Sequence, residues 1–247
     1  MQEPRVRRVK AADIVAAAIV VLVATAPALA AGDPVPFPHL RPHQTVTGGA
    51  SGAASTAARP AVQVPINPNS PFSPAQQVAL ANISAYFNSF SLLEGDFIQI
   101  GPNGEQSEGV FFLRKPGKIR FHYNPPAKLD VISDGSTIAI KDGRSGTQDM
   151  YPLSKTPLRY LLAANIDLTS TNLVNQVREE ADLVMVTIVQ KGAFAEGTLT
   201  LTFDKKTYEL RQWQVTDAQG RNTSVAIFNT TAGKPQTDPN LYRVVPQ

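Results

Sequence analysis

The sequence predicts a mainly β domain with some α structure, in which helices cover the opening of a curled antiparallel sheet. Three observations lead to this prediction. Short strand-like segments follow one another from residue 95 onward, separated by tight turns rich in Gly, Pro, Asn and Asp. Several of them alternate apolar and polar residues, so one sheet face should be buried. Two segments with helical apolar periodicity accompany the strands.

The first 30 residues have the features of a cleavable secretion signal. Basic residues between Arg5 and Lys10 precede an apolar run, Ile14–Ala26, and small residues follow at Ala28 and Ala30. The apolar run is shorter than the roughly 20 residues that a spanning helix needs, although an uncleaved membrane anchor is the alternative. We therefore expect an exported protein, in the periplasm.

Charge and cysteine content limit the partners and the class of exported protein that we expect. The chain carries +3, but its leader holds four cations and two anions, so the mature protein is near +1 and nucleic acid is not an expected partner. No cysteine is present, which leaves no disulfide and no lipid-attachment cysteine. An exported chain without disulfides needs a sizeable core, as is common in the bacterial periplasm.

Residues 31–72 are predicted to be a disordered or extended linker. They contain eight prolines and the stretch "TGGASGAAS", with few large apolar groups. Such a segment cannot bury enough surface to offset the entropy of ordering it. It is either a spacer or a variable tail, and residues 73–247 form the expected single domain.

The domain is predicted to begin with a helix. Ser73 is a good N-cap, Pro74 suits the first helical position, and Gln76 completes a capping box. An apolar stripe recurs along one side of this helix, at Ala79, Ile83, Phe87 and Phe90.

Strands are expected on both sides of a second, shorter helix. That helix is "TPLRYLLAANIDL", capped at Thr156 or its neighbour and begun by Pro157. Short connections imply an antiparallel meander, and about eleven or twelve strands should make the sheet curl. The expected strands are 95–100, 108–115, 118–123, 128–133, 136–142, 147–153, 174–180, 183–190, 196–204, 209–217, 222–230 and 240–246.

The chemistry argues against an enzyme, a metal site or a cofactor. Of three histidines, His39 and His43 lie in the linker, which leaves His122 alone in the domain. It is mid-strand, where a structural or exposed histidine is the more common explanation. No glycine-rich loop joins a strand to a helix, and the aspartates beside glycines fit ordinary turns.

The order of the motifs resembles that of the periplasmic outer-membrane lipoprotein carrier proteins, LolA, over about residues 76–246. After an amphipathic helix come "GDFIQ", Gly109–Gly117 ("GVFFLRKPG"), "ISDG", "TPLRYLL", "LRQWQVTDAQGRNTSVAIFN" and "LYRVVP". The resemblance implies a half-open, incomplete β-barrel closed by a helical lid. It also implies a hydrophobic cavity for lipoprotein acyl chains, an inner-membrane ABC-type releasing complex as donor, and an outer-membrane receptor as acceptor.

The apolar residues that share one face of the strands, and those on the apolar side of the helices, are the ones expected to line that cavity. From the sheet and the two helices they are Phe87, Phe97, Leu113, Ile119, Phe121, Tyr123, Leu158, Leu161 and Leu162, any of which could instead be plain core. Trp213 fits a core anchor as well as a cavity wall.

The resemblance also assigns a gating role to the basic residue directly before the proline of "LRKPG". The family usually has Arg there, whereas this chain has Lys115, preceded by Arg114, and Lys cannot make planar bidentate contacts. Arg114 or Arg120 could share the role. We expect Lys115 to bond backbone carbonyls of the "TPLRYLL" lid, and a solvated hairpin tip is the alternative.

Three function classes follow from the sequence. The first is a monomeric carrier that takes acylated lipoproteins from the inner to the outer membrane. The second is a lipid- or lipoprotein-sensing module on the same fold, without transfer activity. A periplasmic hydrolase is the third, disfavoured by the scarcity of histidine.

Overall fold

The protein is described from a computed structural model, which places residues 65–156, 158–169, 173–190, 197–217 and 219–245. The expected signal segment 1–30 and residues 31–64 of the expected linker lie outside these ranges. Within the described ranges, we find no helix with the length and apolarity that crossing a membrane would require.

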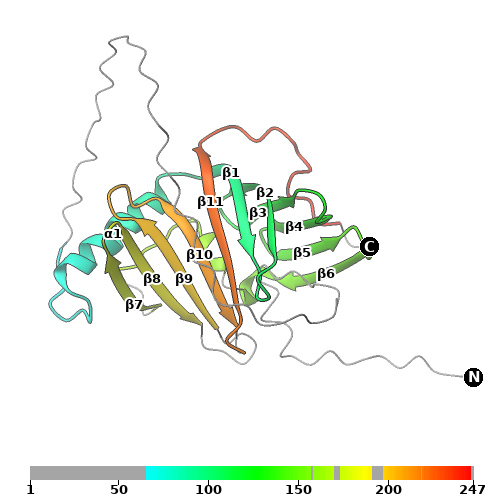
Figure 1. Ribbon diagram of the computed structural model, residues 1–247. Helices are drawn as coiled ribbons and strands as arrows, with labels where there is room; N and C mark the ends of the chain where they lie inside the picture. Colours follow the sequence, from blue (N-terminus) through cyan, green and yellow to red (C-terminus); the bar gives the residue numbers. More distant parts are fainter. Residues whose placement is uncertain (1–64, 157, 170–172, 191–196, 218, 246–247) are drawn as a thin grey trace, which may run out of the picture. The chain divides into compact units, whose positions relative to one another are not determined.

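Eleven strands form one antiparallel sheet that curls without closing (Figure 1). Its order is β6-β5-β4-β3-β2-β1-β11-β10-β9-β8-β7. Consecutive strands pair except β6 and β7, which are the two edges, and β1 pairs with β11. This confirms the predicted fold class. The strands are β1 (Leu92–Ile100), β2 (Gln106–Arg114), β3 (Lys118–Tyr123), β4 (Leu129–Asp134), β5 (Thr137–Asp142), β6 (Thr147–Pro152), β7 (Val174–Glu180), β8 (Leu183–Gln190), β9 (Gly197–Asp204), β10 (Leu210–Asp217) and β11 (Asn222–Ala232).

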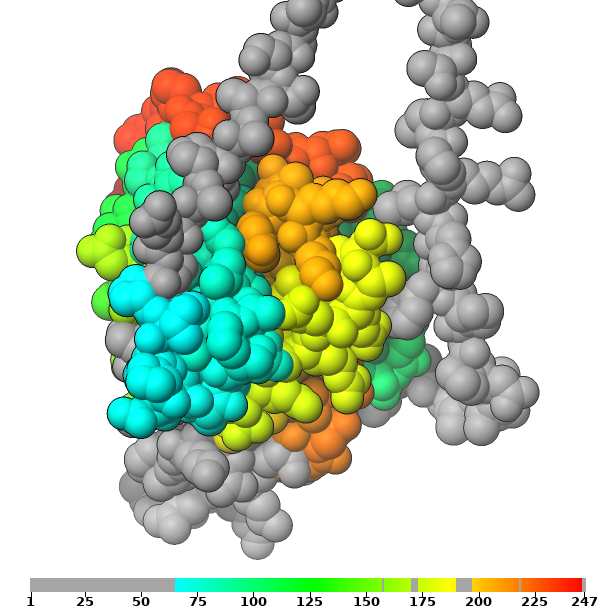
Figure 2. All heavy atoms as spheres, turned by 90° about the vertical axis from the view of Figure 1, so that its left-hand side faces the viewer, coloured from blue at the N-terminus to red at the C-terminus, as the bar shows by residue number. Residues whose placement is uncertain are grey.

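Helix α1 (Pro74–Asn88) begins where its capping signals predict. The Ser73 hydroxyl accepts from the Gln76 amide, the Gln76 side chain accepts from the Ser73 amide, and Pro74 opens the first turn. Figure 2 shows α1, in cyan, beside the strands of the C-terminal half of the sheet. The residues that precede the Ser73 N-cap also contact the helix. The Gln77 side chain forms hydrogen bonds with backbone groups of Asn67 and Phe72.

One face of the sheet, hereafter the inner face, packs against the helices. Along β9, Leu199, Leu201 and Phe203 are buried while the threonines between them are partly exposed, as the alternation predicts. Side chains of this face join those of both helices in a single apolar cluster. The core therefore lies between the curled sheet and its helical cover.

The connection from β6 to β7 joins the two edge strands of the sheet. It contains the 3-10 turn η2 (Leu153–Lys155) and the short helix α2 (Leu158–Leu161). Its apolar residues Leu158, Leu161, Leu162, Ile166 and Leu168 belong to the core cluster. We call residues 158–169 the lid segment.

The lid helix is shorter than predicted, covering four residues rather than most of 156–168. Pro157, its expected first residue, lies outside the described ranges. The helix ends early because backbone groups of the following residues bond to side chains of α1. Ile166 pairs with Asn88 and Leu168 with Ser84, so these groups need no intrahelical partner.

The predicted last strand, 240–246, is wrong, since the described residues 240–245 form turns and irregular backbone. The amides of Leu241 and Arg243 donate to carbonyls three residues earlier, which satisfies them locally. Side chains hold this C-terminal segment to the sheet instead of ladder bonds. The Arg114 guanidinium lies 5.5 Å from the Tyr242 ring centroid, and the Gln148 amide donates to Val245 O.

Candidate functional site

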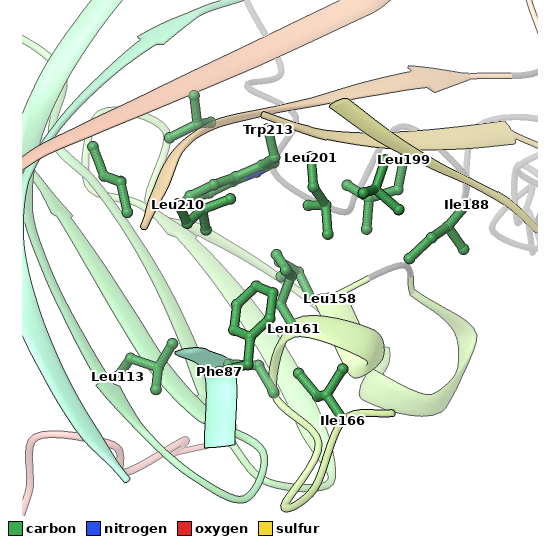
Figure 3. Close-up of a cluster of buried hydrophobic side chains, with 14 of the residues drawn as sticks. Phe87, Leu113, Leu158, Leu161, Ile166, Ile188, Leu199, Leu201, Leu210 and Trp213 are labelled. Carbon is green, nitrogen blue, oxygen red and sulfur yellow. The ribbon is translucent and has the colours of Figure 1, made fainter. Parts of the chain in front are cut away.

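The residues expected to line a cavity all belong to the apolar core cluster. Figure 3 labels four of them, Phe87, Leu113, Leu158 and Leu161. Each of the expected residues is at most 8 % exposed, and Phe97 and Phe121 are completely buried. The figure shows Phe87 of α1 and Leu161 of α2 between Leu113 on one side and Ile188 on the other. Sheet and helix side chains thus meet across the interior.

The interior holds two small cavities that share Phe87 and Leu161. The first, of about 20 Å³, is almost wholly apolar and includes Phe90, Leu113 and Trp213 in its walls. The second, of about 110 Å³, lies between the lid segment and β8–β9. A cavity of 20 Å³ has room for about one water molecule. The interior is therefore packed, and an acyl chain would require the cover to move.

Aromatic rings organise the centre of the inner face. Phe97 contacts Phe121 and Tyr123 edge-on, with ring centroids 5.1 and 4.9 Å away. The Tyr123 hydroxyl donates to Gln99 Oε1 at 2.7 Å, and burial raises the pKa of this tyrosine far above its ordinary value. Tyr123 is therefore a neutral, fixed core residue at physiological pH, and it lines neither of the two cavities.

Trp213 is the only tryptophan of the chain and lies in the wall of the smaller cavity. Its side chain is buried and its ring centroid is 6.0 Å from that of Phe121. The indole Nε1 is buried without a hydrogen-bond partner. Its position gives the site an intrinsic optical probe.

Lys115 lies at the end of the cover, in the turn between β2 and β3. Its ammonium donates to Phe87 O near the C-terminus of α1 and lies 4.4 Å from the Phe90 ring centroid. Burial lowers the pKa of Lys115 to about 8. The side chain therefore links the sheet to α1.

The expected partner of Lys115 is thus corrected, since the carbonyl it binds belongs to α1 and not to the lid segment. Carbonyls in the last turn of a helix have no intrahelical partner and attract cations. The same turn does contact the lid segment, but through backbone, because the Gly117 amide donates to Leu162 O at 2.8 Å.

Arg114 and Arg120 point away from Lys115 and its partners. Arg114 donates to Gln236 O in the C-terminal segment. Arg120 forms an ion pair with Asp130 of β4, at 3.1 Å, and His122 Nδ1 lies 2.9 Å from the same carboxylate. Lys115, Arg114 and Arg120 therefore bind three different partners and do not act as one cluster.

The lid segment is fixed to α1 by side chains that the sequence analysis did not single out. Asn88 donates to Ile166 O at 2.8 Å and accepts from the Ile166 amide at 2.9 Å. Ser84 accepts from the Leu168 amide at 2.9 Å. Polar residues on the otherwise apolar side of the last helical turns are the signal that could have revealed them.

A pocket of about 350 Å³ opens where α1, the Lys115 turn and the lid segment meet. We call it the mouth pocket; its walls are Asn88, Ser89, Phe90, Ser91, Lys115, Pro116 and Ala164. Phe90 also borders the smaller inner cavity, so it lines both spaces. A polar rim thus adjoins the apolar interior.

Metal-ligating side chains do not gather within the described ranges, where no three or more His, Cys, Asp or Glu residues lie close enough to hold an ion. His122 is exposed on the sheet, paired with Asp130. We assign no chemistry to this pair.

Comparison with known proteins places these features in a family. Residues 88–243 match the family model described as outer membrane lipoprotein carrier protein LolA. An outer-membrane lipoprotein carrier protein of Chromobacterium violaceum is 26% identical over 185 residues, which span 70% of this chain and 86% of that protein. One from Methylococcus capsulatus is 24% identical over 186 residues, with the same shares covered.

Solved structures include a weaker likeness, the crystal structure of LprF from Mycobacterium bovis. It is 16% identical, with a TM-score of 0.40, over 69% of this chain and 99% of that one. We draw no functional conclusion from it.

Proposed function

Because the chain belongs to the family of outer membrane lipoprotein carrier proteins, LolA, we propose that it is a periplasmic carrier for lipoproteins. It would bind the acyl chains of lipoproteins released from the inner membrane and deliver them to the outer membrane. The observation that supports this most is the architecture of the interior. An open sheet presents its apolar face to the helices, and the core cluster of apolar side chains lies between them.

The energetics of the cargo favour such a design. Each buried methylene contributes about 0.8 kcal/mol, so acyl chains exposed to water are strongly unfavourable. A soluble carrier must replace that burial with side chains and still release the cargo. Since the interior is packed when empty, the apolar contacts between cover and sheet are exchanged for contacts with acyl chains. This exchange keeps the net affinity moderate.

Lys115 is the proposed gating residue. In the packed state it joins the sheet to the carbonyl end of α1, and moving α1 away breaks that bond. The cost of desolvating its half-buried ammonium offsets part of the favourable energy of this contact. The free-energy difference between the packed and open states can then be small enough for cargo binding to shift the equilibrium toward the open state.

Transfer between membranes requires partners on both sides. We assign the donor role to an inner-membrane ABC-type releasing complex and the acceptor role to an outer-membrane lipoprotein receptor. The protein would meet each of them as a monomer.

The proposal is tested by loading and transfer. The mature protein is incubated with spheroplasts that export a model lipoprotein, and native mass spectrometry should show a one-to-one complex. A cargo lacking its lipid should give none. If the acylated cargo gives no complex either, the carrier function is wrong.

Lys115→Leu tests the gate, and Lys118→Leu, at the start of β3 just after the same turn, is the matched control. Lys118 faces Arg114 and Asp134 in the neighbouring strands. The Lys115→Leu variant should stay folded, but its rate of lipoprotein transfer to the outer-membrane acceptor should change several-fold. The Lys118→Leu variant should transfer lipoprotein at the wild-type rate. Unaltered transfer by the Lys115 variant would exclude the gating role.

Loading without transfer would favour a second function, a lipid- or lipoprotein-sensing module. The same mass spectra discriminate between the two functions when acceptor membranes are added. A carrier loses its cargo to them, whereas a sensor retains it.

A further inference from the structure

Lys115 has hydrogen-bonding capacity that the described chain does not use. An ammonium has three N–H donors, and one of them is directed to Phe87 O. No carboxylate within the described residues lies within ion-pair distance of Lys115. The ammonium also lies over the Phe87 and Phe90 rings, but two of its donors and its charge have no anionic or hydrogen-bonding partner among the described residues.

The mouth pocket offers room for such a partner. Its volume of about 350 Å³ is within the range of small-molecule sites, and Lys115 is the only charged residue in its walls. The other polar wall residues are neutral: Asn88, Ser89 and Ser91. A bound group is thus selected by one positive charge.

The pocket also leads toward an apolar space. Phe90 borders the mouth pocket on one side and the inner cavity that Trp213 lines on the other. It is the partly buried end of the α1 stripe, with its ring centroid 4.4 Å from the Lys115 ammonium. A ligand with a head at Lys115 and a chain passing Phe90 would occupy both spaces.

We propose that the mouth pocket binds the carboxylate of a free fatty acid, with Lys115 as the anion-binding residue and the acyl chain passing Phe90 into the interior. A carboxylate accepts two charge-assisted hydrogen bonds, which matches the two unused donors. It also compensates the cost of desolvating the ammonium, the same cost that lowers the pKa of Lys115. A neutral ester or alcohol of equal length offers no such compensation.

This ligand differs from the proposed cargo, whose acyl groups carry no carboxylate. The two functions share the apolar interior but not the charged head, so fatty acid would compete with lipoprotein for the same space. The cover must open for both ligands.

The experiment uses the single tryptophan as its readout. Intrinsic fluorescence of the mature protein is titrated, near neutral pH and below micelle formation, with palmitate, methyl palmitate and acetate. The same titrations are made with Lys115→Met, which keeps an apolar stem, and with Lys118→Met as the matched control.

We expect wild type and Lys118→Met to bind palmitate about tenfold more tightly than methyl palmitate, as one charged hydrogen-bonded contact predicts. In Lys115→Met the preference should disappear while methyl palmitate binding persists, which also shows that this variant is folded. Acetate should change nothing.

Three results would overturn the proposal: equal affinity of wild type for acid and ester, a preference that survives in Lys115→Met, or no binding of either ligand. An equal response to acetate would also overturn it, because the site would then bind small carboxylates without an acyl chain. None of these outcomes affects the lipoprotein complex in the mass spectra, so failure here is distinguishable from failure of the carrier function.

Discussion

Two junctions of the helical cover differ in their chemistry. Between α1 and the lid segment, neutral side chains bond backbone groups, with Asn88 alone making two bonds to Ile166. Between cover and sheet, the polar contacts of the described residues include one lysine, one glycine amide and one glutamine. Lys115 binds Phe87 O, Gly117 donates to Leu162 O, and Gln76 donates to Val177 O at 2.9 Å.

The difference indicates which junction separates first. The bonds described for the first junction come from the neutral side chains of Asn88 and Ser84, and breaking them leaves backbone groups of the buried Ile166 without these partners. The second junction depends in part on the Lys115 ammonium, and the cost of desolvating this ammonium reduces its contribution to the stability of the junction. We therefore expect α1 and the lid segment to leave the sheet together, as one unit, when cargo binds.

The largest effect is expected from Gly117→Ala, because the Gly117 amide donates to Leu162 O at the junction between the sheet and the lid segment. Gly117 has φ +77°, and a Cβ there would lie 2.7 Å from Gly135 Cα. Strain and backbone displacement together should lower the free energy of unfolding by about 3 kcal/mol. Urea denaturation measures this loss.

Gly104→Ala separates the two causes, because Gly104 has φ +81° and open space around its Cβ position. It should cost only about 1 kcal/mol. Equal losses in the two variants would show that Gly117 is needed for its backbone angle alone and not for the close approach.

Asn88→Ala should have the next largest effect, since it removes both bonds to Ile166. We expect a loss of about 2 kcal/mol in urea denaturation. Asn82→Ala is the control, because the Asn82 amide only donates to Val78 O within α1. If the two variants lose the same stability, the Asn88 bonds do not make the junction between α1 and the lid segment stronger than the junction between cover and sheet.

The smallest effect is the pH dependence of the junction between Lys115 and α1. Burial lowers the pKa of Lys115 from 10.5 to about 8, so between these values the unfolded chain binds more protons than the native one. The contribution of Lys115 to stability should therefore rise with pH across that window, by roughly 1 kcal/mol after solvent screening.

The measurement is the difference in unfolding free energy between wild type and Lys115→Met, followed from neutral pH to above pH 10. Other titrating groups cancel in this difference. A flat or falling difference would mean that the ammonium is not desolvated at α1.

Local signals in the sequence determined the elements of the fold. Ser73, Pro74 and Gln76 predict the start of α1 because capping acts within one turn. Alternation and turn residues predict the eleven strands, and parity brings Phe97, Phe121 and their neighbours to one buried face. These signals operate over a few residues and can be read directly.

Contacts between distant segments were decided only by the tertiary structure. The partner of Lys115 lies 28 residues away, at a helix end whose position depends on how α1 lies on the sheet. The lid helix stops after four residues because side chains of α1 satisfy the backbone that follows it. The C-terminal segment forms turns because side-chain contacts hold it in place of a strand ladder. In each case, the competing partner is remote in sequence, so no local pattern could predict it.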